Sequence, residues 1–283
     1  MTLLVFGKTG QVSTELGQLS EAICLGRAEA DLSDPAACAK AIKAANPRVV
    51  INAAAYTAVD RAEEEEDLAT IINGDTPGAM AAACAELGVP FVHISTDYVF
   101  DGQGEAPFLP HAETNPLGAY GRSKLKGEAL VRASGATHAI LRTSWVFSAH
   151  GNNFVKTMLR VSETRNELKV VDDQIGGPTS ARSIARACLS FADQLGKAPD
   201  KSGTYHFSGA PDISWHGFAT EIFSQVGKPM TIHAISTSEY PTPAARPGNS
   251  RMDCNSTQQN FGIAQPEWQA DLAEVLEELD ALG

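Results

Sequence analysis

The chain of 283 residues is short of positive charge, because 22 Lys and Arg residues stand against 34 Asp and Glu residues and give a net charge of −12 at pH 7. Broad binding to nucleic acid needs a basic face, so this balance argues against a nucleic-acid partner. It does not exclude a small anionic ligand, because backbone dipoles and a few cations can hold a phosphate.

Cysteines and long apolar runs are also scarce. The five cysteines are scattered and form no Cys-x-x-Cys pair, which favours small buried residues in a reducing compartment over disulfides or a zinc site. No apolar run approaches the ~18 residues of a membrane span. The first residues lead directly into a glycine-rich loop without the layout of a signal peptide. We therefore expect a cytoplasmic protein with no membrane partner.

The chain opens with an apolar run, residues 3–6, followed by Gly7-Lys8-Thr9-Gly10-Gln11-Val12-Ser13. A buried strand, a glycine turn and a helix N-terminus are typical of a dinucleotide-binding fold, because the glycines let backbone N–H groups approach a pyrophosphate. The third glycine of the usual fingerprint is replaced by Ser13, the next smallest option for close packing. Alone, such a loop is weak evidence.

The second predicted strand, residues 22–25, ends at Gly26 and Arg27. Proteins that prefer NAD usually place an acid here for the ribose hydroxyls. Arg27 can instead pair with a 2′-phosphate, which favours NADPH, or it is an ordinary solvated surface residue. Asp31 then lies where the chain can touch an adenine, and the next strand ends in the small residues 53–55, across which a cofactor can lie flat.

Polar side chains gather at the carboxyl end of the strand predicted over residues 89–100, the edge at which α/β sheets bind ligands. Thr96 can donate a hydrogen bond to a substrate oxygen, and Asp97 can accept one from a sugar hydroxyl or brace the site. A loop then leads to a helix that carries Tyr120 and Lys124 on one face, since positions i and i+4 meet. A nearby ammonium favours the ionised form of a phenol, so the pair is a workable acid/base unit.

Four further features have two interpretations each. His93 lies mid-strand without a partner at metal-ligand spacing, which favours a hydrogen-bonded core residue. The acidic run over residues 63–67 favours a solvated helix start over a metal site. Trp145 can equally stack on a sugar or fill the core. The proline-rich loop over residues 240–251, which contains Arg246, can close over an anionic ligand or simply cross the surface.

Taken together, these motifs resemble the extended short-chain dehydrogenase/reductase superfamily and, within it, the family of dTDP-4-dehydrorhamnose reductases. The resemblance extends from the first residues to near residue 250, and its later motifs are far more specific than the glycine loop. It is carried by residues 6–12, 52–60, 95–100, 120–128, 142–146, 151–154 and 246–250.

This resemblance implies an α/β fold, a Rossmann-type doubly wound parallel sheet with a smaller α/β substrate-binding domain. Residues 1–147 with about 168–195 would form the NAD(P)-binding Rossmann domain. Residues of about 148–167 with 196–283 would form the nucleotide-sugar-binding domain.

The family's reaction is the NAD(P)H-dependent reduction of the C4 keto group of dTDP-4-dehydro-L-rhamnose (dTDP-6-deoxy-L-lyxo-4-hexulose) to dTDP-L-rhamnose. By resemblance, Tyr120 would protonate the oxygen, with its pKa lowered by Lys124, and Thr96 would hydrogen-bond that oxygen. Lys124 would also hold the nicotinamide ribose. The implied cofactor contacts are Gly7, Thr9, Gly10, Gln11, Val12, Arg27, Asp31, Leu32, Ala53, Ala54, Ala55, Tyr56 and Thr57, with Tyr120 and Lys124. The implied substrate contacts are Thr96, Asp97, Trp145, Asn152 and, for the diphosphate, Arg246.

The chain departs from the family pattern at two positions. Some members bind magnesium through glutamates at a dimer interface, and Glu15 matches one of them, but Arg182 occupies the position of the next. An arginine cannot ligate a cation and repels one, so we predict no metal and a monomer or weak homodimer. The other departure is Gly26 in place of the ribose acid, which favours NADPH but leaves NADH possible.

Three alternatives stay open. A dehydratase or epimerase of the same superfamily is disfavoured, because dehydratases place an Asp-Glu pair after the catalytic threonine and here Thr96 is followed by Asp97 and Tyr98. A non-catalytic NADP-binding regulatory subunit would be expected to lack some of the catalytic residues, all of which are present. A different nucleotide-linked ketosugar remains possible, since the sequence identifies neither the base nor the sugar configuration.

Overall fold

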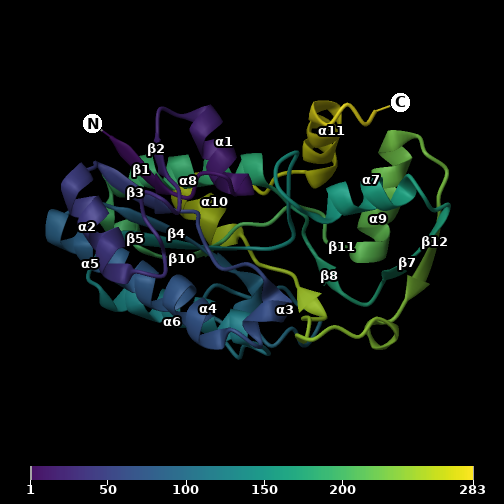
Figure 1. The fold of residues 1–283 in the computed structure, drawn as a ribbon, viewed down its shortest axis with the longest axis horizontal. Coiled ribbons are helices and arrows are strands. Elements are labelled where there is room, and N and C mark those ends of the chain that lie inside the picture. The colour runs from purple at the N-terminus through teal and green to yellow at the C-terminus, as the bar shows by residue number, and fades with distance from the viewer. Residues whose placement is uncertain (1, 283) are drawn as a thin grey trace.

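A parallel six-stranded sheet forms the larger part of the computed structural model, which describes residues 2–282 (Figure 1). Its strands are β1 (Leu3–Phe6), β2 (Ile23–Leu25), β3 (Val49–Asn52), β4 (Phe91–Thr96), β5 (His138–Thr143) and β10 (Gly203–His206). They lie in the order β10-β5-β4-β3-β1-β2, and every neighbouring pair is parallel. The predicted doubly wound sheet is confirmed. The order in which strands are added reverses between β1 and β3, since β2 lies on one side of β1 and β3 to β5 lie on the other, and ligands bind at such a switch point.

Helices cover both faces of this sheet, which is why its central strands are apolar on both sides. One face packs against α1 (Gln11–Leu19), α8 (Ala181–Leu195) and α10 (Asn255–Phe261). The other packs against α2 (Pro35–Ala45), α5 (Thr76–Leu87) and α6 (Ala119–Ala133). Four cysteines are buried and Cys24 is half-buried, as predicted for small interior residues.

Helix α6 approaches its neighbours closely because it contains glycine where a side chain cannot fit. A Cβ atom on Gly121 would lie 2.2 Å from the carbonyl oxygen of Tyr98, and one on Gly127 would lie 2.1 Å from that of Asn73. These contacts join α6 to η2 (Asp97–Val99) and to the π-helical turn η1 (Ile71–Asp75). The helix that carries Tyr120 and Lys124 is therefore fixed on two sides.

The acidic run over residues 63–67 contacts the N-terminus of this same helix, α6, and is not only solvated. The N-cap residue of α6, Gly118, offers no side chain, and the Glu63 carboxylate accepts the Ala119 N–H at 2.9 Å. Glu66, the first residue of α4 (Glu66–Thr70) after α3 (Val59–Ala62), accepts two hydrogen bonds from Arg122 at 2.7 and 2.9 Å. The interpretation as a solvated helix start was incomplete, because a carboxylate stabilises the exposed N–H groups of a helix N-terminus.

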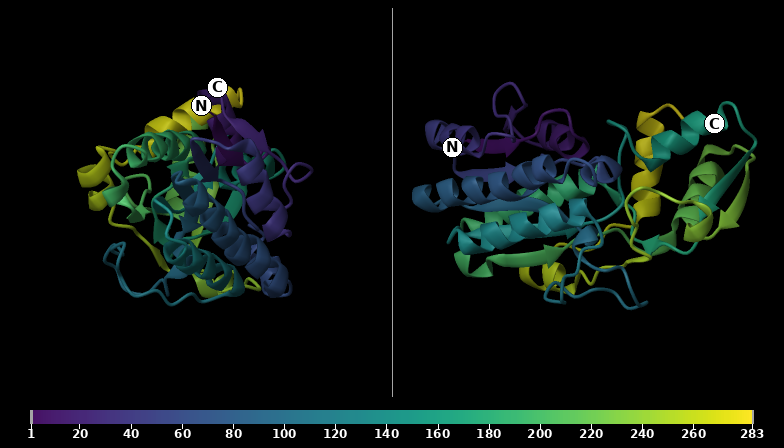
Figure 2. Two further views of the ribbon diagram at one scale, coloured as in Figure 1. Left: turned by 90° about the vertical axis from the view of Figure 1, so that its left-hand side faces the viewer. Right: turned by 60° about the horizontal axis from the view of Figure 1, so that its bottom comes forward.

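The smaller part of the molecule lies beyond the carboxyl ends of the large sheet, and the two parts sit end to end (Figure 2). Its apolar core forms between α7 (Phe154–Ser162), α9 (Trp215–Val226), α11 (Trp268–Glu278) and the strands β7 (Glu167–Val171) and β12 (Thr231–Ile235). Short strands complete it: β6 (Val146–Phe147) with β9 (Thr179–Ser180), and β8 (Ile175–Gly176) with β11 (Ile213–Ser214) and β13 (Asn249–Ser250). A single turn, η4 (Thr237–Glu239), follows β12, and another, η3 (Pro199–Lys201), joins α8 to β10 in the larger part.

Strand pairing differs from the predicted division of the chain in two places. Strand β10 was assigned to the smaller domain, but it pairs with β5 at the edge of the large sheet. Strand β7 was assigned to the Rossmann domain, but it pairs with β12. Helix α8, from the same predicted segment as β7, does pack on the large sheet. Short apolar strands carry no signal for which of two sheets they join.

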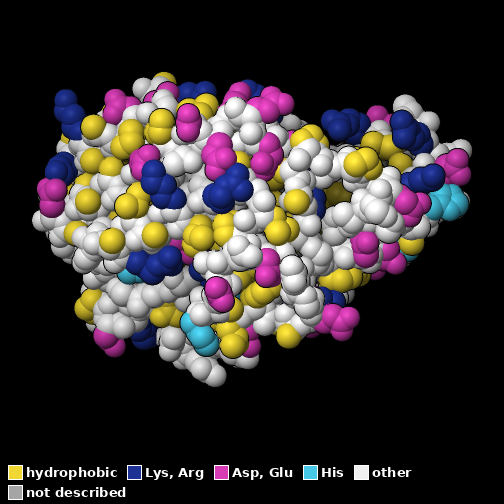
Figure 3. All heavy atoms as spheres, turned by 90° about the horizontal axis from the view of Figure 1, so that it is seen from below, with side chains coloured by type: hydrophobic (Ala, Val, Ile, Leu, Met, Phe, Trp, Pro, Cys, Tyr) yellow, Lys and Arg dark blue, Asp and Glu magenta, His cyan; other side chains and the backbone are white. Residues whose placement is uncertain are grey.

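Within residues 2–282, no helix combines the length and the apolar character needed to cross a bilayer. On the underside of the molecule, Lys and Arg side chains are interspersed with Asp and Glu and do not gather in one basic patch (Figure 3).

Candidate active site

A cavity of about 710 Å³ runs along the carboxyl ends of β1, β3, β4 and β5. The segment over residues 143–152, which leads into the smaller part, bounds its other side. Every predicted cofactor contact lines this cavity, together with Thr96, Asp97, Tyr120, Lys124, Trp145 and Asn152. Arg246 is the one predicted site residue that does not. The structure thus brings the predicted residues into one place, and their individual roles stay predictions.

The glycine loop forms one end of the cavity. Gly7 has a φ of +116°, a conformation that favours glycine, and a Cβ atom there would lie 3.0 Å from the Ser13 hydroxyl. Ser13 therefore packs where the third glycine is expected, because Gly7 leaves room for it. Gly10 caps α1 without a side-chain hydrogen bond, so the N–H groups of the first turn are available to an anion.

At the adenosine end, Gly26 and Arg27 lie on the cavity edge. The Glu29 carboxylate accepts the Gly26 N–H at 3.0 Å and pairs with Lys8 at 3.2 Å, so this acid is already engaged. Arg27 is exposed, and among residues 2–282 no carboxylate lies within 4.0 Å of it. Its guanidinium is available to a phosphate.

The acid/base pair lies near the middle of the cavity. Lys124 is 2% exposed, and its ammonium donates to the Ile94 carbonyl at 2.6 Å. Burial lowers the pKa of Lys124 to about 8, against a smaller opposing effect of the Glu128 carboxylate. Thr96, at the end of β4, donates to Asp97 at 3.0 Å and also contacts the Tyr120 hydroxyl. The three groups are thus positioned by two elements, β4 and α6.

The expected lowering of the Tyr120 pKa is wrong for this structure. Burial, followed by the negative charge of Asp97, raises the pKa of Tyr120 to about 12, and hydrogen bonding with Thr96 offsets only part of this. Burial disfavours the phenolate, and the carboxylate of Asp97 disfavours it further. At neutral pH Tyr120 therefore holds its proton, as a proton donor must.

Asp97 braces the site. One carboxylate oxygen accepts from Thr96 and the other accepts from Ser250 at 2.5 Å, which ties β13 to the end of β4. Burial raises the pKa of Asp97 to about 6 despite these hydrogen bonds. Of the two roles predicted for Asp97, these contacts favour bracing. Sequence reasoning gave no role to Ser250, which lies 153 residues away in the chain.

Trp145 forms an aromatic wall with a residue that the sequence did not reveal. Its ring stacks on Trp215 with centroids 3.6 Å apart and planes 10° apart. The backbone of Trp145 has a φ of +49°, which is strained for a bulky residue. A Cβ on Gly176 would lie 3.0 Å from the ring, so that glycine leaves space for it. Trp145 lines the cavity and also packs against the smaller core, so both interpretations hold in part.

Arg246 lies outside the cavity in a pair with Asp60. Its guanidinium donates to both carboxylate oxygens of Asp60 at 2.8 Å, and Asp60 also accepts the Ala244 N–H at 3.2 Å. The proline-rich loop is therefore tied to α3. Contact between Arg246 and a substrate diphosphate requires this ion pair to open, so the predicted role remains untested.

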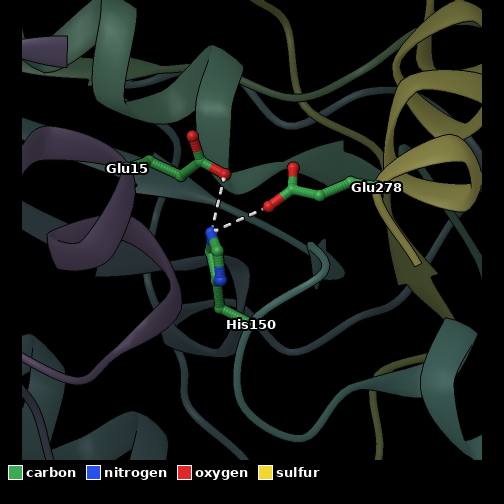
Figure 4. A group of neighbouring side chains, drawn as sticks. All are labelled: Glu15, His150 and Glu278. Carbon is green, nitrogen blue, oxygen red and sulfur yellow. Dashed lines mark ion pairs between the residues drawn. The ribbon is translucent and has the colours of Figure 1, made fainter. Parts of the chain in front are cut away.

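A cluster of Glu15, His150 and Glu278 has the donor types of a metal site, with ligand atoms within 4.8 Å of one another (Figure 4). Arg182 on α8, however, donates to Glu15 and to Glu278, each at 2.9 Å. The His150 ring lies 3.3 Å from Glu15 and 3.6 Å from Glu278. The guanidinium already balances the two carboxylates and repels a second cation, so the residues do not fit magnesium.

We expect the thermal midpoint of the protein to be unchanged by a chelator, because Arg182 supplies the positive charge that joins α1, α8 and α11. Arg182→Glu should lower the midpoint by several degrees at low salt, since it places a third carboxylate in the cluster. Added magnesium should restore part of this loss in the variant and leave the wild type unaffected. A chelator-sensitive wild type would contradict this interpretation.

The comparisons with known proteins agree with this geometry. A family model described as "RmlD substrate binding domain" matches residues 1–281. The chain is 44% identical to a dTDP-4-dehydrorhamnose reductase of Sinorhizobium fredii, over 95% of this chain and 94% of that protein. It is 40% identical to the Escherichia coli K12 protein of the same name, over 99% and 98%.

Solved structures agree as well. A dTDP-4-dehydrorhamnose reductase of Clostridium acetobutylicum superposes with a TM-score of 0.92 at 38% identity, covering 99% of this chain and 100% of that one. One from Bacillus anthracis, in complex with NADP, gives 0.89 at 33% identity, covering 98% and 100%. The chain therefore belongs to the RmlD family of dTDP-4-dehydrorhamnose reductases, within the extended short-chain dehydrogenase/reductase superfamily.

Proposed function

We propose that the protein uses NADPH to reduce the C4 keto group of dTDP-4-dehydro-L-rhamnose to dTDP-L-rhamnose, with Tyr120 as the proton donor. The observation that carries this proposal is one cavity that joins a phosphate-binding glycine loop to a protonated phenol, a buried lysine and a hydroxyl donor. Membership of the reductase family supports the choice of substrate.

The glycine loop and the residues beside it suit a dinucleotide. The open N-terminus of α1 offers backbone N–H groups to a pyrophosphate, and Gly7 permits close approach. Residues 53–55 line the cavity with small side chains, which leaves room for a cofactor. When bound, the reduced nicotinamide supplies the hydride. Complex formation between NADP and the Bacillus anthracis relative supports NADPH as the cofactor.

Tyr120 is suited to complete the reduction. As hydride adds to the C4 carbon, the carbonyl oxygen gains negative charge and takes the proton of the Tyr120 hydroxyl, which leaves a phenolate and the product alcohol. Thr96, at the same end of β4, is suited to orient that oxygen by hydrogen bonding. Lys124 lies one helical turn from Tyr120, and its charged ammonium form stabilises the phenolate.

The indole of Trp145, which stacks on Trp215 behind it, offers a flat apolar surface on the substrate side of the cavity. Sugars present an apolar face formed by their C–H groups, and an aromatic ring packs well against it. Asn152, on the same side, offers amide donors and acceptors. These contacts support a sugar as the substrate.

Arg27→Ala should weaken NADPH binding by about tenfold or more and leave NADH binding nearly unchanged, because a hydrogen-bonded ion pair to a 2′-phosphate is worth roughly 1.5–3 kcal/mol. Titration of both cofactors by nucleotide fluorescence measures the two affinities. Arg48→Ala is the matched control, since Arg48 is also exposed but lies at the opposite end of the sheet. Equal losses for the two cofactors would show that Arg27 is a surface residue only.

The direct test follows the absorbance of NADPH with dTDP-6-deoxy-L-lyxo-4-hexulose present or omitted. We expect substrate-dependent oxidation with dTDP-L-rhamnose as product. Oxidation only with a ketosugar on another nucleotide would replace the substrate. NADPH binding without any turnover would favour the regulatory alternative.

A further inference from the structure

His93 lies against the buried lysine of the acid/base pair. It is 0% exposed in the middle of β4, and its ring Nε2 is 3.4 Å from the Lys124 nitrogen. Besides His93, the Lys124 nitrogen contacts the Ile94 carbonyl at 2.6 Å. The prediction of a hydrogen-bonded core histidine is confirmed by its contact with Asn52, and the other side of its ring faces a residue of the candidate active site.

The neighbouring strand determines which ring nitrogen carries the proton. Asn52, at the end of β3, is paired in register with His93. Its side-chain oxygen accepts the Ala54 N–H at 3.2 Å, so its NH₂ group faces His93 Nδ1, also at 3.2 Å. An amide NH₂ is only a donor, so Nδ1 must accept. A neutral imidazole that accepts at Nδ1 carries its proton on Nε2.

The Nε2–H group therefore points at Lys124. An ammonium has three donors and no acceptor, so it faces this N–H as one donor against another. A neutral amine has a lone pair and can accept it. The imidazole is neutral, because burial and then the Lys124 charge hold the pKa of His93 well below its usual value, so the ring carries only this one proton.

The other charged groups around Lys124 do not reverse this preference. Glu128, one turn further along α6, favours the ammonium, but its oxygens are bound by Arg142 and Ser95. Tyr120, one turn earlier, is protonated and neutral. Burial of Lys124 acts in the same direction as His93, since it disfavours the ammonium.

We propose that the Asn52–His93 pair controls the protonation of Lys124 and so sets the pH above which this lysine loses its charge during turnover. The proposal rests on the proposed function. Because the Nε2–H group favours the amine, Lys124 loses its charge at a lower pH than it would beside a hydrogen-bond acceptor. The amine then accepts the His93 Nε2–H. His93 is thus a positioning residue that acts through Lys124.

The first test measures the tautomer directly and does not depend on turnover. Two-bond ¹H–¹⁵N correlation spectra of protein labelled at its histidine rings distinguish a proton on Nε2 from one on Nδ1, and the His93→Phe spectrum assigns the signal. We expect the neutral Nε2–H form from pH 6 to pH 9. An Nδ1–H tautomer, or a charged ring, overturns the proposal even if the protein proves to be an active reductase.

The second test is the pH profile of kcat for NADPH oxidation. His93→Phe removes the N–H and keeps an aromatic ring in the stack with Phe91. The alkaline decline of kcat should move to a pH about one unit higher, because the free energy of the lost hydrogen bond corresponds to a pKa shift of about that size. The KM for NADPH should change little. A merely structural role would lower activity without moving the profile.

Two further variants keep the second test decisive. Asn52→Leu leaves the imidazole in place but removes the donor that fixes its tautomer. Nε2 can then accept a hydrogen bond from the ammonium, and the alkaline decline of kcat should again move to higher pH. His138→Phe removes another buried imidazole of the same sheet, one that contacts the Ala136 carbonyl, and its profile should match the wild type. Folded His93→Phe and Asn52→Leu enzymes with unmoved profiles overturn the proposal.

Discussion

Replacing Tyr120 with phenylalanine should lower kcat by about 10²- to 10⁴-fold, the usual contribution of a general acid, and leave NADPH binding unchanged. The substitution removes one hydroxyl and retains the ring, which packs edge-on against Tyr98 with centroids 5.5 Å apart. The cavity walls therefore persist, and so does the glycine loop. Water is a poor substitute for the hydroxyl, because a donor fixed beside Thr96 needs no reorganisation during the reaction.

Single-turnover oxidation of NADPH measures this loss, and fluorescence titration of the cofactor measures binding separately. Tyr205→Phe is the matched control, since it removes a phenol hydroxyl that donates to the Lys201 carbonyl in the core, outside the cavity. It should retain full turnover. If Tyr120→Phe kept more than a tenth of the wild-type kcat, another group would have to be the proton donor.

The sequence predicted the elements that local patterns define. The run before Gly7 is a strand because it is apolar throughout and ends at a glycine turn, and Asp34 with Pro35 starts α2 as a cap and a first-turn proline do. The cofactor contacts follow from the same logic, because the carboxyl ends of parallel strands share one edge. Helical spacing alone gave only a weak signal for the pair of Tyr120 and Lys124, and the strand that ends at Thr96 before it strengthened the prediction.

What the sequence did not predict depends on contacts between distant segments. Ser250 bonds to Asp97 across 153 residues, and Arg246 bonds to Asp60 across 186. No local pattern contains either pair, and the stacked residues Trp145 and Trp215 are likewise far apart in the sequence. The pKa of Tyr120 was predicted in the wrong direction because the sequence shows a neighbouring lysine but not the extent of burial.

Glu128→Gln should destabilise the protein by roughly 3–5 kcal/mol, because it leaves the buried charge of Arg142 without its partner. Glu128 is 0% exposed and accepts two hydrogen bonds from Arg142, at 2.8 and 2.7 Å, and one from Ser95 at 2.7 Å. Arg142 is 3% exposed and also donates to the Pro110 carbonyl at 3.1 Å. The pair thus joins α6 to β4, β5 and the loop after β4. Urea unfolding at pH 7 measures the loss.

The same pair should make the fold sensitive to acid. Burial alone raises the pKa of Glu128, but hydrogen bonds and charge from Arg142 outweigh it, so the net shift is downward. A depressed carboxyl pKa contributes stability above the unfolded value of about 4.3 and loses it as the pH falls through the folded value. The wild type should therefore lose stability below about pH 4 faster than Glu128→Gln does, and urea midpoints across this range test the difference.

A matched exposed pair on the same helix separates burial from charge. Arg122 makes the same two-pronged contact with Glu66, but these side chains are 46% and 43% exposed. Solvent screens this pair, so Glu66→Gln should cost no more than about 1 kcal/mol. Replacing both buried partners, as in Glu128→Met with Arg142→Met, should recover much of the loss, because no charge is then left unpaired. Since Glu128 lies one turn from Lys124, a fully stable double variant with reduced turnover would show that the pair also positions the catalytic helix. Equal costs for the buried and the exposed pair would show that burial contributes nothing to the strength of the Glu128–Arg142 contact.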